Sequence, residues 1–284
     1  MNLAAAQFLN QLDAIRGQRQ SELPFPAGRQ GYRLPNLAEM DAHRLSSETS
    51  VPGISLSLGP EAQNNWVVLP RQEAADWSIK LRCELRCCDN VVVLGPRTRI
   101  KCTLWFQGSR GLMVFAGDVE WWSFLDVRLS SNEETFFWGA RSTSNGASVV
   151  MQGDRGNVAV GEDCMFATDV TIRNSDLHGM IDMETGHWLN PPGHVHLEPH
   201  VWLGQGAKIL KNATVGYGSI VAAGAVVTGD LPRFSAAGGI PARVIRRNVS
   251  WTRCRTPEPG LREKLLKAEP EVISNDRVPG FRFA

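Results

Sequence analysis

A histidine flanked by two aspartates is the most chemically suggestive group in the sequence: Asp176, His178 and Asp182 lie close together along the chain. An imidazole exchanges its proton near neutral pH, so a well-placed histidine can act as a general base. A neighbouring carboxylate can hold the imidazole in the required tautomer by accepting a hydrogen bond from the second ring nitrogen. We therefore predict a proton-transfer site at His178, with Asp176 or Asp182 as its partner.

Four further histidines lie within a short distance along the chain: His187, His194, His196 and His200. Such a cluster can form a zinc site, because imidazole is a common zinc ligand. The alternative is that these side chains serve the loop and the coil around it. We favour this second interpretation and predict no bound metal.

A strict six-residue repeat predicts the secondary structure that must position these residues. Its aliphatic members are Leu197, Leu203, Ile209, Val215, Val221 and Val227. Small residues precede five of them by two positions, at Val201, Ala207, Ala213, Ser219 and Ala225. Neither a helix nor a simple strand has this period, whereas the coils of a hexapeptide parallel β-helix do. Three hexapeptides form one triangular coil, and stacked coils share a continuous apolar core.

The position of His178 follows from the same repeat. Val160, Phe166 and Ile172 continue the step of six upstream, and a further step from Ile172 would place His178 inside the coil. A buried imidazole without partners is costly. We therefore expect the chain to leave the coil in a loop at about 173–196, which carries His178.

The remaining organisation is weaker in the sequence. Leu94, Ile100, Phe106 and Leu112 keep the step loosely, but Asp118, Ser130, Ser142 and Asp154 break it, so loops or displaced coils are expected at 113–157. We expect an N-terminal helix (Ala4 to Arg19), connector and cap over 1–89, the β-helix over 90–232 and a C-terminal extension over 233–284. An aromatic group flanks the irregular stretch and is predicted either to stack on a sugar or to close a loop onto the core: Trp121, Trp122, Phe124, Phe136, Phe137 and Trp138.

Composition excludes several classes of function. Thirty Lys and Arg against 29 Asp and Glu give a net charge of +1, which argues against nucleic acid or an anionic membrane as partner. Residues 1–19 hold no apolar stretch of the ~20 residues that a membrane span needs, and no signal peptide is evident. The six cysteines show no Cys-x-x-Cys spacing and are predicted to be reduced core thiols. We expect a cytoplasmic protein without a transmembrane segment.

The run from Val201 to Thr228, followed by Gly238-Gly-Ile-Pro-Ala-Arg-Val-Ile, resembles the C-terminal signature of hexapeptide-repeat acyltransferases. Within that family, Ser175-Asp-Leu-His, Asn190-Pro and His200-Val-Trp resemble the capsular and surface-polysaccharide O-acetyltransferases. The resemblance implies a mainly β fold, a left-handed parallel β-helix with an N-terminal helix or arm, a cap and a C-terminal extension. It also implies a homotrimer that binds acetyl-CoA between neighbouring subunits.

The resemblance further implies roles for individual residues. His178 matches the catalytic histidine, Asp176 its partner, and Trp202 an indole beside the thioester. Coenzyme A carries phosphates and amides, which cations and backbone N–H groups bind. The expected donor-binding residues are Trp202, Gly204, Lys208, Ala222, Ala223, Arg243 and Arg246.

Together these observations predict an O-acetyltransferase that moves an acetyl group from acetyl-CoA directly to a sugar hydroxyl of a surface polysaccharide or glycan precursor. An alcohol is a poor nucleophile until a base removes its proton, which is the role expected for His178. Three alternatives remain open: an amino-sugar or antibiotic acetyltransferase on the same fold, a zinc enzyme resembling γ-class carbonic anhydrases, and a non-catalytic solenoid scaffold. The spacing of His194, His196 and His200 departs from the His-x4-His pattern of those zinc enzymes.

Overall fold

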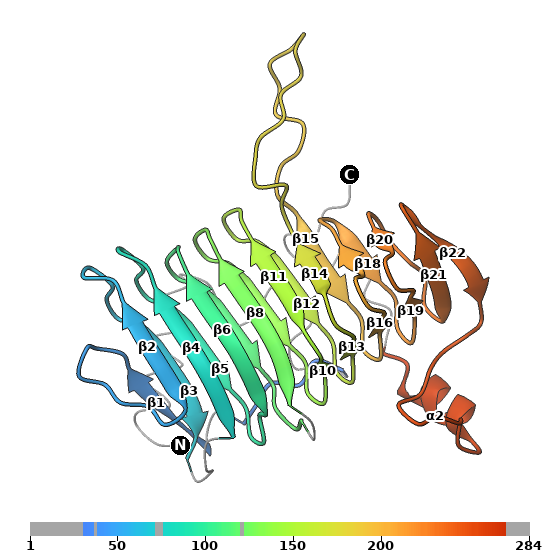
Figure 1. Cartoon of the computed structure of the whole chain (residues 1–284), viewed down its shortest axis with the longest axis horizontal. Coiled ribbons are helices and arrows are strands. Elements are labelled where there is room, and N and C mark those ends of the chain that lie inside the picture. Colours follow the sequence, from blue (N-terminus) through green and yellow to red (C-terminus); the bar gives the residue numbers. More distant parts are fainter. Residues whose placement is uncertain (1–30, 37–38, 72–75, 120–121, 271–284) are drawn as a thin grey trace.

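The chain winds into a parallel β-solenoid whose successive coils add one strand to each of its sheets (Figure 1). The computed structural model describes residues 31–36, 39–71, 76–119 and 122–270. The first sheet, sheet A, contains β1 (Met40–Arg44), β3 (Trp66–Pro70), β5 (Val91–Leu94), β7 (Leu112–Phe115), β9 (Thr135–Trp138), β12 (Asn157–Val160), β15 (His194–Leu197) and β18 (Ala213–Val215).

The second sheet, sheet B, runs beside it along the whole solenoid. It contains β2 (Ile54–Leu58), β4 (Trp77–Cys83), β6 (Ile100–Phe106), β8 (Ser123–Leu129), β11 (Ala147–Met151), β14 (Val170–Arg173), β17 (Lys208–Ile209) and β20 (Val226–Val227).

The third sheet, sheet D, forms only in the C-terminal half. It contains β10 (Thr143–Ser144), β13 (Met165–Phe166), β16 (Trp202–Leu203), β19 (Ile220–Val221), β21 (Ser235–Gly239) and β22 (Ala242–Arg247). A helix, α2 (Leu261–Ala268), follows the last strand. The N-terminal coils therefore have two sheets, and the C-terminal coils have three.

The six-residue repeat at the C-terminal end is confirmed as the wall of the coils. Its aliphatic members, from Leu197 to Val227, are all at most 1% exposed and belong to one continuous core. Trp202 pairs with Ile220 and Lys208 with Val226, so one coil takes 18 residues. The mainly β, parallel solenoid predicted from the repeat is the fold that the structure shows.

The stretch expected to contain loops or displaced coils is instead regular, with longer coils. Trp77 pairs with Ile100 and Ile100 with Ser123, a step of 23 residues. This step is not a multiple of six, which explains why the repeat disappears from the sequence. Parallel pairing begins with β2, so the coils start upstream of the boundary expected at residue 90. At the other end β21 still pairs in parallel with β19, beyond the expected boundary at residue 232.

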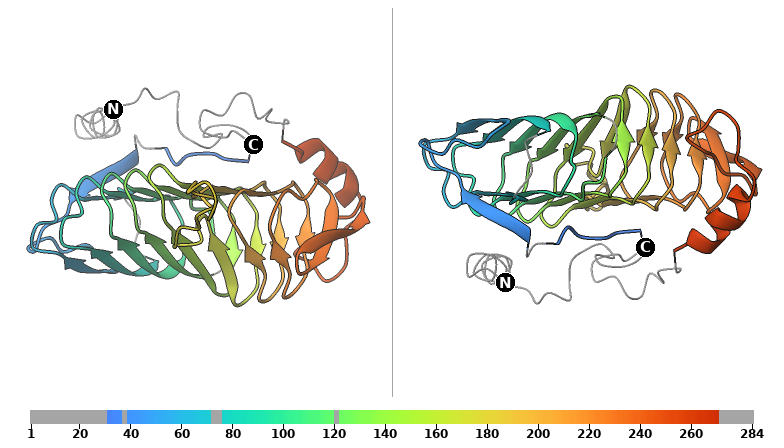
Figure 2. Two further views of the ribbon diagram at one scale, coloured as in Figure 1. Left: turned by 90° about the horizontal axis from the view of Figure 1, so that it is seen from above. Right: turned by 90° about the horizontal axis from the view of Figure 1, so that it is seen from below.

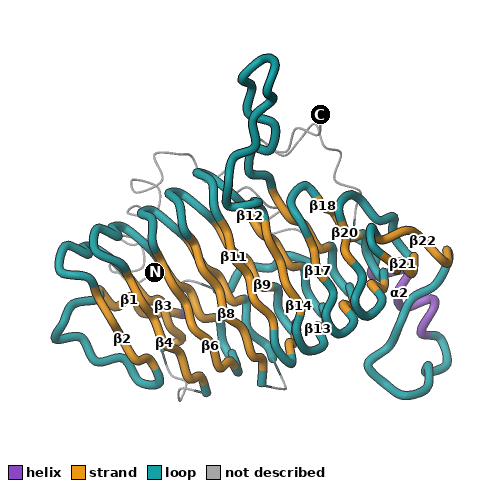
Figure 3. Tube along the Cα trace, turned by 45° about the horizontal axis from the view of Figure 1, so that its top comes forward, coloured by secondary structure: helices purple, strands orange, loops and turns teal. Residues whose placement is uncertain are grey.

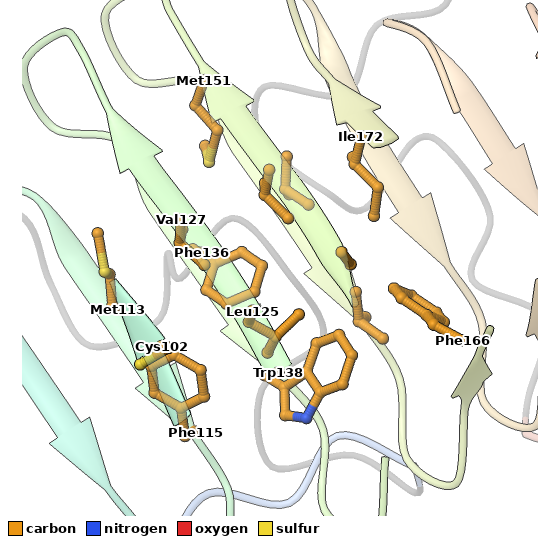
Figure 4. Packing of buried hydrophobic residues seen from close by; sticks show 14 of the residues in the cluster. Cys102, Met113, Phe115, Leu125, Val127, Phe136, Trp138, Met151, Phe166 and Ile172 are labelled. Carbon is orange, nitrogen blue, oxygen red and sulfur yellow. The ribbon is translucent and has the colours of Figure 1, made fainter. Parts of the chain in front are cut away.

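Large side chains fill the long coils (Figure 4). Phe115 and Phe136 pack edge to face at 5.7 Å, and Trp138 and Phe166 do so at 5.0 Å. The indole N–H of Trp138 donates to the carbonyl of Ser142 at 3.1 Å, so no polar atom of this ring is left unpaired in the core.

Residues 31–36, which precede the first coil, lie against the outer face of sheet A (Figure 2). Tyr32 is 1% exposed, packs near Phe137 and forms a short hydrogen bond with Nε2 of His196. Arg33 binds the carboxylate of Glu162 through Nε and Nη2, each at 3.0 Å. Sheet A is therefore covered on both faces, whereas the outer face of sheet B carries polar and aromatic side chains. The helix expected at Ala4 to Arg19 lies outside the described residues.

Candidate functional site

Residues 174–193, which we call the finger, leave the solenoid between β14 and β15 and project from its edge (Figure 3). Hydrogen bonds within the finger hold its two arms together. Leu189 N donates to Met180 O and Asp182 N to His187 O, both at 2.8 Å. An antiparallel bridge joins Ile181 to Trp188. His178 lies at the base of this structure, and its side chain is exposed.

Asn190 organises the base of the finger. Its Nδ2 donates to the carbonyl of His178 at 2.9 Å and to Oδ2 of Asp176 at 2.8 Å. Its Oδ1 accepts from Met180 N at 2.6 Å and from Trp188 Nε1 at 3.0 Å. The residue is 9% exposed, so these contacts are sheltered from water. The sequence offered only one signal for this role, an Asn-Pro pair in a polar loop.

The two carboxylates expected to orient His178 are bound elsewhere. Oδ2 of Asp176 accepts from Lys211 Nζ at 2.6 Å as well as from Asn190, and the hydrogen bond from Lys211 is the main reason why the pKa of Asp176 is lowered. Asp182 accepts from the backbone N–H groups of Glu184 and Thr185 at 2.9 and 2.7 Å. Asp176 thus contacts His178 only through Asn190, because Lys211 in the next coil draws the carboxylate toward the solenoid.

Trp202 lies on the outer face of sheet D. Successive strand pairings place Met165, Trp202, Ile220, Ala236 and Arg246 in one row across that sheet. At about 4.8 Å per strand, Arg246 is roughly 14 Å from Trp202 along this row. The Trp202 indole is half-buried beside Trp251, with the ring centroids 6.1 Å apart.

A cluster of polar and aromatic side chains packs beside Trp202 on this side of the solenoid. Trp251 stacks on His200 at 4.3 Å between centroids, and its indole N–H donates to the His200 carbonyl at 2.8 Å. Nδ1 of His200 lies 2.7 Å from Asp163 Oδ2, and Arg253 Nε donates to Asp163 Oδ1 at 2.8 Å. Burial would raise the pKa of Asp163, but His200 and Arg253 lower it below its usual value. The cluster ties the segment after β22 to the coil that carries Trp202.

Three of the expected donor-binding residues meet at the corner between sheets D and B. A Cβ on Gly204 would lie 2.6 Å from Ala223 N and 2.9 Å from Ala222 C, so only glycine allows the two coils to approach this closely. Lys208 follows on the sheet B side of this corner and is exposed. Arg243 is also exposed, on β22 opposite Gly238.

Within one chain His178 and Trp202 lie on opposite sides of the solenoid. The chain runs from sheet A to sheet D to sheet B in each C-terminal coil, and the finger leaves at the corner from sheet B back to sheet A. Sheet D is the side opposite that corner, and Figure 1 shows the finger at one edge and β13 at the other. The structure therefore places the expected donor-binding residues on sheet D and at its corner with sheet B, with Arg243 and Arg246 farther along on β22, and separates them all from His178 of the same chain.

The finger also exposes a group of apolar side chains. Met183 is 87% exposed, and four further apolar residues are 54–61% exposed: Met180, Ile181, Trp188 and Leu189. On the β21–β22 hairpin Ile240 and Ile245 are 77% and 70% exposed. Apolar side chains gathered in this way mark contact surfaces.

The remaining histidines are dispersed. His194 contacts Asn157 and His196 contacts Tyr32 on the outer face of sheet A, whereas His187 is exposed on the finger. Burial is the main cause that lowers the pKa of His196. In the part of the chain that the structure describes, no three His, Cys, Asp or Glu side chains form a group that could hold a metal ion.

Trp121 lies outside the described residues, and the described members of the aromatic group are divided among three environments, so these do not form one platform. Phe136 and Trp138 point into the core, and Phe137 packs on the outer face of sheet A. Trp122 and Phe124 are exposed, by 44% and 43%. Among the cysteines, Cys254 is exposed and so is not the core thiol expected for it.

Known proteins resemble this chain over part of its length. The chain is 39% identical over 113 residues to the polysialic acid O-acetyltransferase of Escherichia coli O1:K1 and 28% identical over 124 residues to that of Neisseria meningitidis. These matches cover 40% and 43% of the chain and 37% and 56% of the two relatives. No family model matches the sequence.

Solved structures extend the similarity. The polySia-specific acetyltransferase NeuO superposes with a TM-score of 0.58 at 26% identity, covering 73% of this chain and 88% of NeuO. The polysialic acid O-acetyltransferase OatWY shares the fold, with a TM-score of 0.55 over 74% of this chain and 95% of its own. No helix in the described ranges is long and apolar enough to cross a membrane. The comparisons thus confirm the predicted resemblance to hexapeptide-repeat acyltransferases and, within them, to polysaccharide O-acetyltransferases.

Proposed function

We propose that the protein is an acetyl-CoA-dependent O-acetyltransferase that acts on a hydroxyl of a polysaccharide sugar. The observation that carries this proposal is the joint similarity, in sequence and in fold, to enzymes named polysialic acid O-acetyltransferases. The residue types at the finger and at the corner between sheets D and B support it. A histidine can act as the base in transfer from a thioester to an alcohol, and a half-buried indole N–H and backbone N–H groups can stabilise the oxyanion that forms.

In the proposed reaction His178 removes the proton of the sugar hydroxyl as its oxygen attacks the carbonyl carbon of the thioester. The new C–O bond forms, the C–S bond breaks, and the proton held by the imidazole passes to the departing sulfur. Asn190 supports the base by holding the backbone of His178 and the side chain of Asp176. The indole N–H of Trp202 and backbone N–H groups at the corner are the proposed partners of the developing oxyanion.

We further propose that each active site is completed by two subunits of a homotrimer. His178 and Trp202 are on opposite sides of one chain, so a site that uses both needs His178 from one subunit and Trp202 from the next. The exposed apolar side chains of the finger support this arrangement, since insertion between subunits would remove them from water. Arg243 and Arg246 on β22 and Lys208 are the proposed partners of the coenzyme A phosphates.

Complementation between two inactive variants tests this arrangement. We expect His178→Ala and Trp202→Ala subunits, each with low turnover alone, to regain activity when they are co-expressed. Random mixing gives about a quarter of the interfaces an intact His178 and an intact Trp202, because each interface joins two different surfaces. Release of free thiol from acetyl-CoA with polysialic acid as acceptor measures the recovery.

The matched control co-expresses the double variant His178→Ala/Trp202→Ala with Trp202→Ala, a mixture that keeps an intact His178 in half of the subunits but in which no interface can be complete. If the mixture of single variants is as inactive as this control while sedimenting as trimers, the shared site is ruled out. Wild-type protein that releases no thiol with any glycan acceptor would instead count against the acetyltransferase itself.

A further inference from the structure

The outer face of sheet B in the N-terminal coils has a composition that the proposed chemistry leaves unexplained. Strands β4, β6 and β8 alternate strictly, so that every second residue points outward. The outward side chains of sheet B include six cations on five of its strands: Lys80, Arg82, Lys101, Arg128, Arg173 and Lys208. Asp126 is the acidic residue among the outward positions of these strands.

These cations differ from those at the coil corners. At the corners arginines are neutralised by carboxylates: Arg86 by Glu61, Arg99 by Asp76 and Arg155 by Glu133. Within the described ranges, the cations on the face of sheet B form no ion pair. The face therefore keeps a local positive charge, although the net charge of the chain is only +1.

Aromatic side chains are interleaved with the cations in register. Arg82, Trp105 and Arg128 are successive partners across β4, β6 and β8, and the two guanidinium groups lie 4.8 and 3.9 Å from the centre of the Trp105 ring. Trp105 Nε1 donates to Glu84 Oε1 at 2.8 Å, which fixes the ring. Two outward rows away on the same strands, Lys101 pairs with Phe124, which is 43% exposed.

The face is hollowed into a trough of about 540 Å³. Lys80, Lys101, Phe124 and Ser148 line it, together with Thr171 at its far end. Two carboxylates, Asp126 and Asp169, also line the trough. From β4 to β14 it crosses four strand spacings, or about 19 Å, which is longer than a single sugar ring. The trough lies over the N-terminal halves of these strands and ends at β14, whose C-terminal end leads into the finger with His178.

We propose that this trough binds an extended, carboxylate-bearing polysaccharide, the same chain whose hydroxyls are acetylated at His178. Unpaired cations recognise carboxylates, hydroxyl side chains recognise sugar hydroxyls, and exposed aromatic rings pack on the C–H face of a pyranose. Lysine is less frequent in subunit interfaces than on the rest of a protein surface. The lysines of the trough therefore support the view that it stays open to solvent in the trimer. A polymer held there keeps further sugars near the finger and so raises their effective concentration. This inference rests on the proposed function for its occupant.

The test measures binding separately from turnover. In the His178→Ala background, fluorescently labelled polysialic acid of defined lengths is titrated into the full-length protein, with neutral dextran and an oligodeoxynucleotide of matched charge as comparison probes. We expect affinity to rise with chain length until the trough is filled. The Lys80→Glu/Lys101→Glu variant should weaken binding about tenfold or more, because attraction is replaced by like-charge repulsion. Lys264→Glu/Lys267→Glu on α2 is the control, since it changes the net charge equally.

Phe124→Ser provides a second variant that leaves the charge unchanged, and we expect it to weaken binding severalfold. The inference is overturned if Lys80→Glu/Lys101→Glu, folded and trimeric, binds the polymer like the control, or if the oligodeoxynucleotide binds more tightly than polysialic acid. The same substitutions are also made in protein with an intact His178. If that protein acetylates the polymer with an unchanged acceptor KM, the proposed function stands and the binding role of the trough is refuted. If the protein binds the polymer in a length-dependent way but acetylates no glycan, the trough stands and the proposed function is refuted.

Discussion

The N-terminal and C-terminal coils solve the same packing problem with different side chains. The N-terminal coils take about 23 residues, have two sheets and enclose rings such as Phe115, Phe136 and Trp138. The C-terminal coils take 18 residues, have three sheets and enclose aliphatic residues beside alanines such as Ala207 and Ala225. Close packing requires the coil to match the volume of what it encloses, so larger residues need a longer circuit.

The difference also decides what each region can present outward. A seven-residue strand of sheet B such as β4, β6 or β8 carries three outward side chains, enough for a continuous polar face. A two-residue strand such as β16 or β17 carries one, and its coil consists mostly of tight corners with exposed backbone. We infer that the long coils hold the polymer and the short coils hold the donor.

Replacing the proposed base should give the largest effect and should leave the binding surface intact. We expect His178→Ala to lower kcat by roughly 10²- to 10⁴-fold, because positioned proton transfer contributes about that much. Affinity for polysialic acid should not change. His187→Ala, on the same finger, is the control and should retain turnover. Equal turnover in the two variants would assign the base to another residue.

Truncating one large core residue should distinguish the two kinds of coil. We expect Trp138→Ala to lower the free energy of unfolding by about 3–5 kcal/mol, because the wide coil cannot collapse around the space left by the ring. Val215→Ala in a short coil should cost about 1–3 kcal/mol, since less volume is removed. Urea denaturation of both variants measures the difference. Equal losses would mean that the width of the coil does not depend on its aromatic filling.

A buried carboxylate in the long coils should make their stability depend on pH. Burial is the main cause that raises the pKa of Glu134 to about 8 from 4.5. Between these values the folded state holds a proton that the unfolded state has lost, so stability falls as pH rises. We expect Glu134→Gln to remove this loss, on the order of a few kcal/mol. Thermal unfolding at pH 5 and pH 8 checks it; an identical fall in the variant would place the cause elsewhere.

Removing the indole on sheet D should give the smallest of these effects. We expect Trp202→Ala to raise the KM for acetyl-CoA or to lower its productive use by about tenfold, which corresponds to the loss of one apolar contact and one N–H donor. Binding of polysialic acid should be unaffected. Trp122→Ala, an exposed indole next to β8, is the matched control. If Trp202→Ala changed the affinity for polysialic acid instead, the assignment of polymer binding to the long coils and donor binding to the short coils would be wrong.

Several features of the fold and of the candidate site could be predicted from the sequence. The coils from Leu197 to Val227 are visible in the sequence because one coil takes 18 residues, a multiple of six. Each inward-pointing residue therefore recurs at the same position of every coil. His178 breaks that repeat, so its departure from the coil was also predictable. The coils around Phe115 and Trp138 were not, because a step of 23 residues has no hexapeptide register. The partners of Asp176 were missed because Lys211 reaches it from a later coil.

The sequence by itself determined that the chain forms a parallel solenoid, which residues line its C-terminal core and where the histidine-bearing loop leaves it. These follow from local period, and period is a property of neighbouring residues. Only the tertiary structure decided that His178 and Trp202 lie on opposite sides, that Asn190 rather than Asp176 supports the histidine directly, and that Arg82, Trp105 and Arg128 form one row. Stacking one coil on the next creates these relations, and the number of residues per coil sets them.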